Sequence, residues 1–318
     1  MTSSVRRGRA AFSSTMPAVA TASSRHHDDA AGPLLQVDRL GVQFGSQHVL
    51  RDISIDLDPG QTLVVLGESG CGKTVLLKTM IGLIRPTSGF VRFEGQSLAT
   101  LSDRALAHTR TRYGFVFQGA ALFDSLSIRD NIAFPLREHT RLAEPDINGI
   151  VESLVDEVGL PRSVLEKKPV QISGGMRKRA GLARALALDP HLVLYDEPTT
   201  GLDPIMSDVI NELILTVSRR PHTTSVVVTH DMNTARKVAD RVIMLYPLFR
   251  LQSGEPQVVF DGTPDELDRS NDPRIRQFVE GRAGARLMEL REEQAREAGQ
   301  RDEASRASEA EPSTEEDE

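Results

Sequence analysis

The sequence predicts an α/β fold in which buried strands alternate with helices and end on polar side chains. A glycine-rich loop at residues 67–74 separates a short apolar run at 62–66 from a stretch with helical spacing at 75–81. A second apolar run at 191–195 ends in two carboxylates, and a third at 223–229 ends in a histidine. Because ligands bind at strand ends in open α/β sheets, these observations also predict where a functional site lies.

The glycine-rich loop fits the phosphate-loop pattern G-x-x-x-x-G-K-[ST] at every fixed position. Its residues are Gly67, Glu68, Ser69, Gly70, Cys71, Gly72, Lys73 and Thr74. A strand, a glycine turn and a helix together place backbone N–H groups around one point, which favours an anion. Lys73 supplies a charge for the β- and γ-phosphates of a nucleotide, and the Thr74 hydroxyl can ligate Mg²⁺.

Composition bounds the class of protein. The chain has 318 residues, of which 39% are hydrophobic and 26% charged, so one large or two small domains with a sizeable core are expected. A net charge of −7 argues against a nucleic-acid partner. No apolar run approaches the ~18–20 residues that span a bilayer, so we expect a chain that is soluble or peripheral to a membrane through partners.

Cys71 is the only cysteine, which excludes an intrachain disulfide and favours a reducing compartment. It lies at the expected N-terminus of the helix that follows the phosphate loop. A helix N-terminus lowers the pKa of a thiol, so we expect Cys71 to favour the thiolate form. A thiol reagent should then react with Cys71 and block ATP binding. An inert spacer in the loop is the alternative.

The first 33 residues are rich in Ser, Ala and Arg, with no acidic residue before Asp28. We expect a disordered N-terminal tail at 1–33, and an organelle transit peptide is the alternative interpretation. Strand-like alternation begins at 35–44 and returns at 52–57. Phe44 ends the first of these segments, where it either packs in the core as a strand aromatic or stacks on a nucleotide base.

The central part of the chain predicts a strand at 90–93 and another at 113–118, which places Gln118 at a ligand-binding strand end. Helical spacing follows through 127–160. Ser173, Gly174 and Gly175 then precede an amphipathic helix that reaches residue 188. A Ser-Gly-Gly helix start is a second anion-binding arrangement, although a plain N-cap explains it equally well.

The carboxylates at the next strand end suggest two roles. Asp196 can hold Mg²⁺ directly or through water, whereas Glu197 lies one residue further and can face an attacking water. A turn containing Asp203 leads into a helix at 205–219, and His230 follows the strand at 223–229. The chain continues with expected strands at 240–246 and 257–261, helices at 263–269 and 272–281, and a charged helix at 285–298 before a disordered acidic tail.

The order and spacing of these motifs resemble those of ATP-binding-cassette (ABC) ATPases over residues 34–281. The resemblance implies an ABC-type phosphate-loop core with an antiparallel β subdomain and an inserted α-helical subdomain at about 119–185, followed by a C-terminal tail at 282–318. The matching motifs are Walker A at 67–74, the Q-loop Gln118, the signature motif at 172–176, the Walker B Asp196, the catalytic Glu197, the D-loop Asp203, the switch His230 and the adenine-stacking Phe44.

The resemblance also implies a mechanism. Two copies of the chain form a head-to-tail homodimer that buries two ATP–Mg²⁺, each held by one Walker A loop and by the other subunit's Ser173, Gly174 and Gly175. Glu197 orients and polarises the attacking water, Lys73 and His230 act at the γ-phosphate, and Gln118 couples the site to a membrane partner. The implied ligands of Mg²⁺ are Thr74, Gln118 and Asp196.

The signature motif narrows the subfamily. Met176 stands where the family usually has glutamine, and residues 173–179 and 271–281 resemble the ATPases of Mla/Mce-type lipid transporters. That resemblance implies a membrane permease, an MCE-domain lipid-binding partner and a position on the cytoplasmic face of the inner membrane. The stromal side of the plastid inner envelope is the alternative location.

Other functions compete with this interpretation. One is the ATPase of another ABC importer, for amino acids or metals. Met176 and residues 271–281 argue against it. Another is a soluble mechanical ATPase of DNA repair or translation, but the chain lacks both the long coiled-coil insertion and the second cassette of those proteins. A nucleotide-binding regulator without turnover is disfavoured because Glu197 and His230 are both present.

Overall fold

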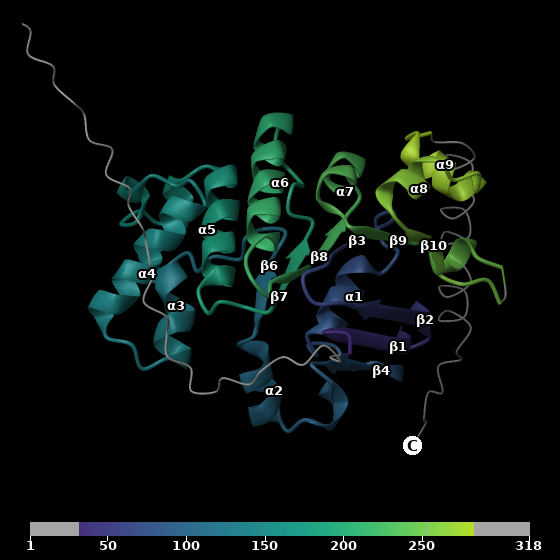
Figure 1. Ribbon diagram of the computed structural model, residues 1–318, viewed down its shortest axis with the longest axis horizontal. Helices are drawn as coiled ribbons and strands as arrows, with labels where there is room; N and C mark the ends of the chain where they lie inside the picture. The colour runs from purple at the N-terminus through teal and green to yellow at the C-terminus, as the bar shows by residue number, and fades with distance from the viewer. Residues whose placement is uncertain (1–31, 253, 283–318) are drawn as a thin grey trace, which may run out of the picture. The chain divides into compact units, whose positions relative to one another are not determined.

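The computed structural model describes residues 32–252 and 254–282, which form two sheets and their surrounding helices (Figure 1). One sheet has four strands in the order β2-β1-β4-β5, and the other has six in the order β10-β9-β3-β8-β7-β6. The strands are β1 (Leu35–Phe44), β2 (Gln47–Leu57), β3 (Thr62–Leu66), β4 (Ser88–Phe93), β5 (Gln96–Ser97), β6 (Tyr113–Val116), β7 (Leu192–Asp196), β8 (Thr224–Thr229), β9 (Arg241–Leu245) and β10 (Val258–Gly262).

The helices lie on both faces and at both ends of the six-stranded sheet (Figure 1). They are α1 (Lys73–Met80), α2 (Asp103–Arg110), α3 (Ile128–His139), α4 (Glu144–Glu157), α5 (Gly174–Leu186), α6 (Pro204–Ser218), α7 (Met232–Val238), α8 (Pro264–Asp268) and α9 (Pro273–Val279). Short 3-10 turns occur at η1 (Leu98–Thr100), η2 (Arg162–Val164), η3 (Pro169–Gln171) and η4 (Leu248–Arg250). This arrangement confirms the predicted α/β cassette fold with an antiparallel β-sheet and added helices.

The six-stranded sheet brings its functional strand ends to one edge. Strand β8 pairs in parallel with both β3 and β7, and β6 extends the parallel set beyond β7. Only β10 runs antiparallel, as a partner of β9. Because β3, β7 and β8 run in the same direction, the phosphate loop, the two carboxylates and the histidine all follow the carboxyl ends of neighbouring strands.

Side-chain alternation divides the core between the two faces of the parallel sheet. Leu63 and Val65 of β3 belong to the core formed with the antiparallel sheet and α1, whereas Val64 and Leu66 belong to the core on the other face. Successive side chains of a strand point to opposite faces, so an all-apolar strand such as β3 fills both cores. The phosphate loop therefore leaves a strand that is fixed on both sides.

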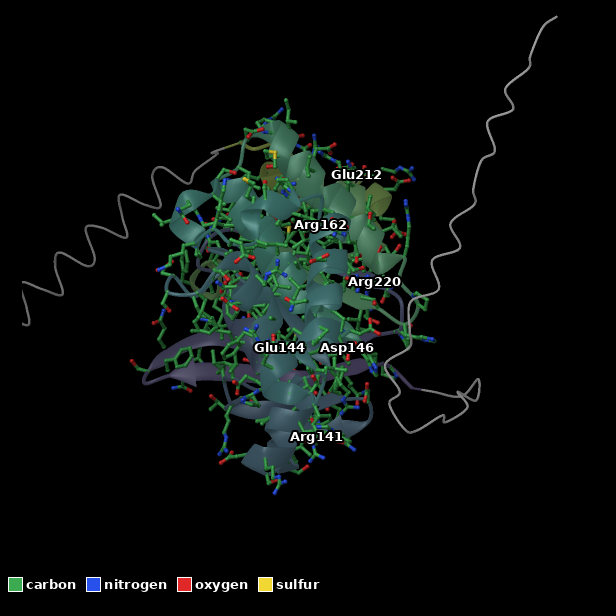
Figure 2. The ribbon with its side chains drawn as sticks, turned by 90° about the vertical axis from the view of Figure 1, so that its left-hand side faces the viewer. Arg141, Glu144, Asp146, Arg162, Glu212 and Arg220 are labelled. Atoms are coloured by element: carbon green, nitrogen blue, oxygen red, sulfur yellow. The ribbon has the colours of Figure 1, made fainter. Side chains whose placement is uncertain are left out.

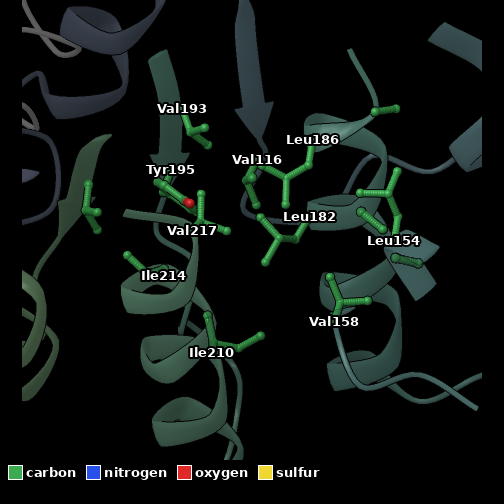
Figure 3. Close-up of a cluster of buried hydrophobic side chains, with 14 of the residues drawn as sticks. Val116, Leu154, Val158, Leu182, Leu186, Val193, Tyr195, Ile210, Ile214 and Val217 are labelled. Carbon is green, nitrogen blue, oxygen red and sulfur yellow. The ribbon is translucent and has the colours of Figure 1, made fainter. Parts of the chain in front are cut away.

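The second core joins the sheet to the helical subdomain of α3, α4 and α5. In Figure 3, Val116, Leu182 and Leu186 face the side chains of Ile214 and Val217 around β7. These side chains are at most a few per cent exposed, so burying them supplies most of the favourable free energy that holds α5 against the sheet. Helix α5 thereby packs against β6, the neighbour of the strand that ends in the carboxylates.

The outer surface of the helical subdomain is charged. Figure 2 looks onto this end of the molecule, where Glu144 and Arg162 lie at the surface. Arg162 donates to Glu152 at 2.7 Å, and Arg220, which follows α6, donates from Nε to Oε1 of Glu157 at 3.0 Å. The second pair joins the end of α4 to the end of α6, so it connects the helical subdomain to the core.

Several element boundaries differ from the sequence-based expectation. The expected strand at 113–118 ends at Val116, so Gln118 lies in a turn. The helices expected within 127–160 are present as α3 and α4, with a break between them at 140–143. Helix α2 was not predicted, because only one of its residues, Thr109, is buried and it therefore carries no apolar periodicity.

The expected N-terminal tail at 1–33 lies almost entirely outside the described residues, as do the charged helix at 285–298 and the acidic tail. Those expectations remain predictions. Within the part of the chain that the structure describes, no helix is both long enough and apolar enough to span a bilayer.

Candidate functional site

The phosphate loop begins where β3 ends and closes where α1 begins. Its glycines Gly67, Gly70 and Gly72 have φ values of 154°, 84° and 101°, which side-chain-bearing residues rarely adopt. A Cβ added at Gly67 would lie 2.5 Å from the carbonyl oxygen of Leu245, so the backbone packs too closely for any larger residue. Gly72 is the N-cap of α1 and offers no side-chain cap, which leaves the first N–H groups of α1 for a ligand.

Lys73 folds back into this loop. Its ammonium donates to the carbonyl oxygens of Gly67 at 2.8 Å and Glu68 at 2.9 Å, and it lies 3.6 Å from Oε1 of Glu197. The residue is only 6% exposed. A buried ammonium that is held by neutral carbonyls can exchange them for phosphate oxygens at little cost, because a charged acceptor makes the stronger hydrogen bond.

Asp196 is the last residue of β7 and faces the start of α1. Its Oδ1 accepts a hydrogen bond from Thr74 Oγ1 at 2.9 Å. Burial raises the pKa of this carboxyl above its usual value, although the Thr74 hydrogen bond and two lysines act in the opposite direction. A buried carboxylate and a hydroxyl at this distance form an oxygen donor pair of the kind that hard divalent cations prefer.

Glu197 has an unusual backbone conformation that directs its side chain. Its φ of 48° lies in the left-handed region, which costs a non-glycine residue ~1–2 kcal/mol. Its carboxylate Oε2 lies 2.8 Å from Nδ1 of His230 and accepts from the Thr200 hydroxyl at 3.1 Å. The structure therefore brings together Lys73, Glu197 and His230, although they come from three separate strand ends.

The remaining candidate residues lie elsewhere. Phe44 ends β1 and is 51% exposed, and Gln118 is exposed in the turn after β6. Ser173 caps α5 by accepting from Met176 N at 3.3 Å, and Asp203 caps α6 by accepting from Met206 N at 3.0 Å. Among the described residues, none of the four makes a hydrogen bond or ion pair with the cluster, so their ligand-binding roles remain predictions.

The expected reactivity of Cys71 is wrong. The side chain is 2% exposed and packs within the core beneath the antiparallel sheet. Burial raises the pKa of the thiol, and this desolvation outweighs the opposing effects of Lys73 and of a backbone hydrogen bond. The helix N-terminus therefore does not produce a reactive thiolate here.

Sequence reasoning missed the residues that support the site. Gln257 is 1% exposed and donates to the carbonyl oxygen of Cys71 at 3.1 Å, while Arg250 pairs with Glu68 at 2.6 Å. Lys178 of α5 donates to the carbonyl oxygen of Pro198 at 2.7 Å. No local pattern marks these residues, because each contact joins segments that are far apart in the sequence.

Comparison with known proteins places this geometry in a family. A family model described as ABC transporter matches residues 50–200. The chain is 42% identical over 252 residues to the probable ribonucleotide transport ATP-binding protein mkl of Mycobacterium leprae, covering 79% of this chain and 70% of that protein. The chain belongs to the ABC transporter ATP-binding proteins. It is also 39% identical over 248 residues to the intermembrane phospholipid transport system ATP-binding protein MlaF of Haemophilus influenzae, covering 78% and 90% of the two chains.

Solved structures show the same cassette. One is a dimeric ATP-binding cassette in a post-hydrolysis state bound to ADP and Pi, with a TM-score of 0.65, 28% identity, and coverage of 72% of this chain and 98% of that one. Another is cbiO1 from Clostridium perfringens, part of the ABC transporter complex cbiONQ, with a TM-score of 0.66, 26% identity, and coverage of 81% and 99%. The chain is therefore an ABC-type ATPase that binds ATP, as the sequence predicted, and it serves a transporter rather than a soluble mechanical machine.

Proposed function

We propose that this ABC ATPase works as a head-to-tail homodimer that drives phospholipid movement through a membrane permease and an MCE-domain lipid-binding partner. The observation that carries the proposal is the cluster of Lys73, Glu197 and His230 at the strand ends, beside the Asp196–Thr74 pair. Identity to MlaF over most of that protein supports the lipid cargo. The dimeric solved relatives support the homodimer.

The geometry gives each residue of the cluster a role in hydrolysis. The N–H groups of the loop and of the first turn of α1 would hold the β- and γ-phosphates, with Lys73 leaving its carbonyl partners to join them. Glu197 would accept the proton of the attacking water, and His230 would hold the carboxylate in place through Nδ1. Ser173, Gly174 and Gly175 of the partner subunit would close the site from the other side, with Phe44 against the base and Asp203 at the dimer contact.

The residues present fit a magnesium ion. Asp196 is buried and its pKa is raised, and within the described residues the Thr74 hydroxyl is the one group that donates to its carboxylate, so a divalent cation would offset the cost of keeping the carboxylate ionised. Thr74 and Asp196 would hold Mg²⁺, and Gln118 would complete the set. When bound, the ion would neutralise charge on the phosphates and polarise them.

An exposed apolar patch supports docking to a permease. Phe123 and Phe134 are 45% and 39% exposed, and their ring centroids lie 4.9 Å apart. Arg184 of α5 lies over the Phe123 ring and donates to the carbonyl oxygens of Ala120 and Ala121, in the segment that follows Gln118. Movement at Gln118 would therefore reach the aromatic pair through a short, hydrogen-bonded segment.

The proposed location is the cytoplasmic face of the inner membrane. The curated relatives described above are bacterial, and the plastid alternative finds no support in them. The two relatives are named for different cargoes, since one is a probable ribonucleotide transport protein and the other a phospholipid transport protein. Ribonucleotide is therefore the competing cargo that an experiment must separate from phospholipid.

Affinity purification of the tagged chain from detergent-solubilised membranes tests the proposal. Mass spectrometry should identify a multi-helix permease, an MCE-domain protein and phospholipid. Phe134→Asp should lose the permease while keeping ATPase activity, whereas Phe249→Asp, at an exposed aromatic outside the patch, should retain it. Recovery of a different permease or of ribonucleotide would overturn the lipid cargo, and recovery of no membrane protein would overturn the whole assembly.

A further inference from the structure

Helix α5 carries a buried cation that the proposed chemistry does not use. Lys178 lies five residues after Ser173, is only 9% exposed, and directs its ammonium beneath the segment that follows β7. There it donates to the carbonyl oxygen of Pro198 at 2.7 Å and to that of Glu197 at 3.4 Å. Lysine is almost never buried in this way without a specific partner.

The burial of Lys178 is costly for the fold. Desolvation lowers the pKa of the ammonium, and the nearby Glu197 charge offsets this only in part. Neighbouring buried positions on the same helix are small or apolar, such as Ala180 and Leu182, and an apolar side chain would be easier to bury here as well. Packing alone therefore does not explain why a lysine occupies position 178.

What the cation holds is the strained backbone of the acid. Glu197 has its φ at 48°, and its N–H donates to the carbonyl oxygen of Val228 on β8 at 2.9 Å. Its own carbonyl oxygen accepts from Lys178 and from the N–H of Thr200 at 3.3 Å. The residue is thus held from β8 on one side and from α5 on the other, which keeps its carboxylate directed at His230.

We propose that Lys178 is a positioning residue for Glu197 and that it links the two nucleotide sites of the dimer. The inference rests on the proposed function, in which Ser173, Gly174 and Gly175 at the N-terminus of α5 contact the nucleotide held by the other subunit. Lys178 lies five residues after Ser173, which is ~7.5 Å along the same rigid helix at a rise of ~1.5 Å per residue. ATP that is bound by the partner subunit and contacts the start of α5 therefore also fixes the Lys178 ammonium beneath Glu197 of the same chain.

The link has a kinetic consequence. A misplaced catalytic group loses rate steeply, by roughly a hundredfold for about 1 Å, while substrate binding is unaffected. Removing Lys178 should thus reduce kcat and leave the KM for ATP nearly unchanged, because the phosphate loop and its Lys73 are not touched. The dependence of rate on ATP concentration should also become less steep, which lowers the Hill coefficient. The reason is that ATP bound at the second site no longer affects the position of Glu197 in the first site.

The test compares Lys178→Met, which keeps the length of the side chain but removes its charge and donors, with Lys178→Gln, which keeps an N–H donor. The matched control is Arg179→Met, on the same helix, because Arg179 donates to the carbonyl oxygen of Gly159, away from the site, at 2.6 Å. ATPase kinetics, ATP affinity and thermal unfolding are measured for each purified chain, with Glu197→Gln alongside.

We expect Lys178→Met to lower kcat at least ~10-fold with KM and ATP affinity within about twofold of the unaltered chain. Lys178→Gln should recover part of that rate with a lowered Hill coefficient, and Arg179→Met should keep kcat within about twofold.

Unchanged kcat in Lys178→Met would overturn the proposal, as would losses of kcat, ATP affinity and melting temperature in parallel. If Lys178→Met does not fold, Lys178→Gln with unaltered kcat and Hill coefficient overturns it. An unaltered chain without turnover, or an active Glu197→Gln, would instead refute the proposed site.

Discussion

Replacing Gln257 by leucine should destabilise the protein strongly and loosen its phosphate loop. The side chain is 1% exposed and makes hydrogen bonds to backbone atoms of three residues. Its Oε1 accepts from Arg51 N at 2.9 Å, and its Nε2 donates to the carbonyl oxygens of Val49 and Cys71, both at 3.1 Å. Leucine of similar size would fill the space but leave a buried N–H and two carbonyls without this partner.

The magnitude follows from these contacts. Each hydrogen bond contributes roughly 1 kcal/mol net, so the loss is expected to be about 3 kcal/mol in the free energy of unfolding. For a folded region of this size, ~1 kcal/mol lowers the melting temperature by roughly 2–4 °C, which predicts a fall of about 6–12 °C. Because one of the freed carbonyls belongs to Cys71 in the phosphate loop, ATP should also bind several-fold more weakly.

Thermal and urea unfolding of Gln257→Leu and of Gln252→Leu provide the measurement. Gln252 lies five residues earlier and is exposed, so its replacement should change the free energy of unfolding by less than about 0.5 kcal/mol. A loss at Gln257 of less than about 1 kcal/mol, or one equal to that of the control, would refute the reasoning that this glutamine ties the loop in place.

Two further predictions follow from the ionisable groups. Cys71 should react with a thiol reagent at pH 8 far more slowly in the folded protein than in urea, because burial keeps the thiol protonated and covered, and equal rates would contradict its position. Asp130 accepts from Ser127 and Arg137, which lower its pKa, so the ionised carboxylate stabilises the fold above the unfolded pKa of ~3.9 and this contribution disappears as pH falls through the folded value. The difference in unfolding free energy between the unaltered chain and Asp130→Asn should therefore shrink below about pH 4, and a difference that does not vary with pH would exclude the linkage.

The sequence predicts the parts of the site that depend on short segments. The phosphate loop is a contiguous pattern, and Asp196, Glu197 and His230 each follow an apolar run whose end can be read directly. Parallel strands place such ends at one edge of a sheet, and Glu197 and His230 meet there because β7 and β8 are direct neighbours. The family and the cassette fold were predictable for the same reason.

The supporting contacts could not be predicted from the sequence. The hydrogen bond between Gln257 and Cys71 joins positions 186 residues apart, and no local pattern specifies that kind of approach. The position of Cys71 at a helix N-terminus indicated a reactive thiolate, but its burial depends on how the antiparallel sheet covers the loop. In the sequence, Lys178 is one of several basic residues of an amphipathic helix, and only the packing of α5 shows that its ammonium lies beneath Glu197. Long-range packing thus decides which polar residues act as supports.

The central claim is that Glu197 is the base for ATP hydrolysis, and it is tested most directly by Glu197→Gln. ATP hydrolysis and the oligomeric state with ATP–Mg²⁺ are measured together, the second by size-exclusion chromatography with light scattering. We predict turnover reduced by ~10²–10⁴, with ATP still bound and a dimer accumulating, because only the proton acceptor has been removed. Turnover within about twofold of the unaltered chain would contradict the claim and assign the base to another residue.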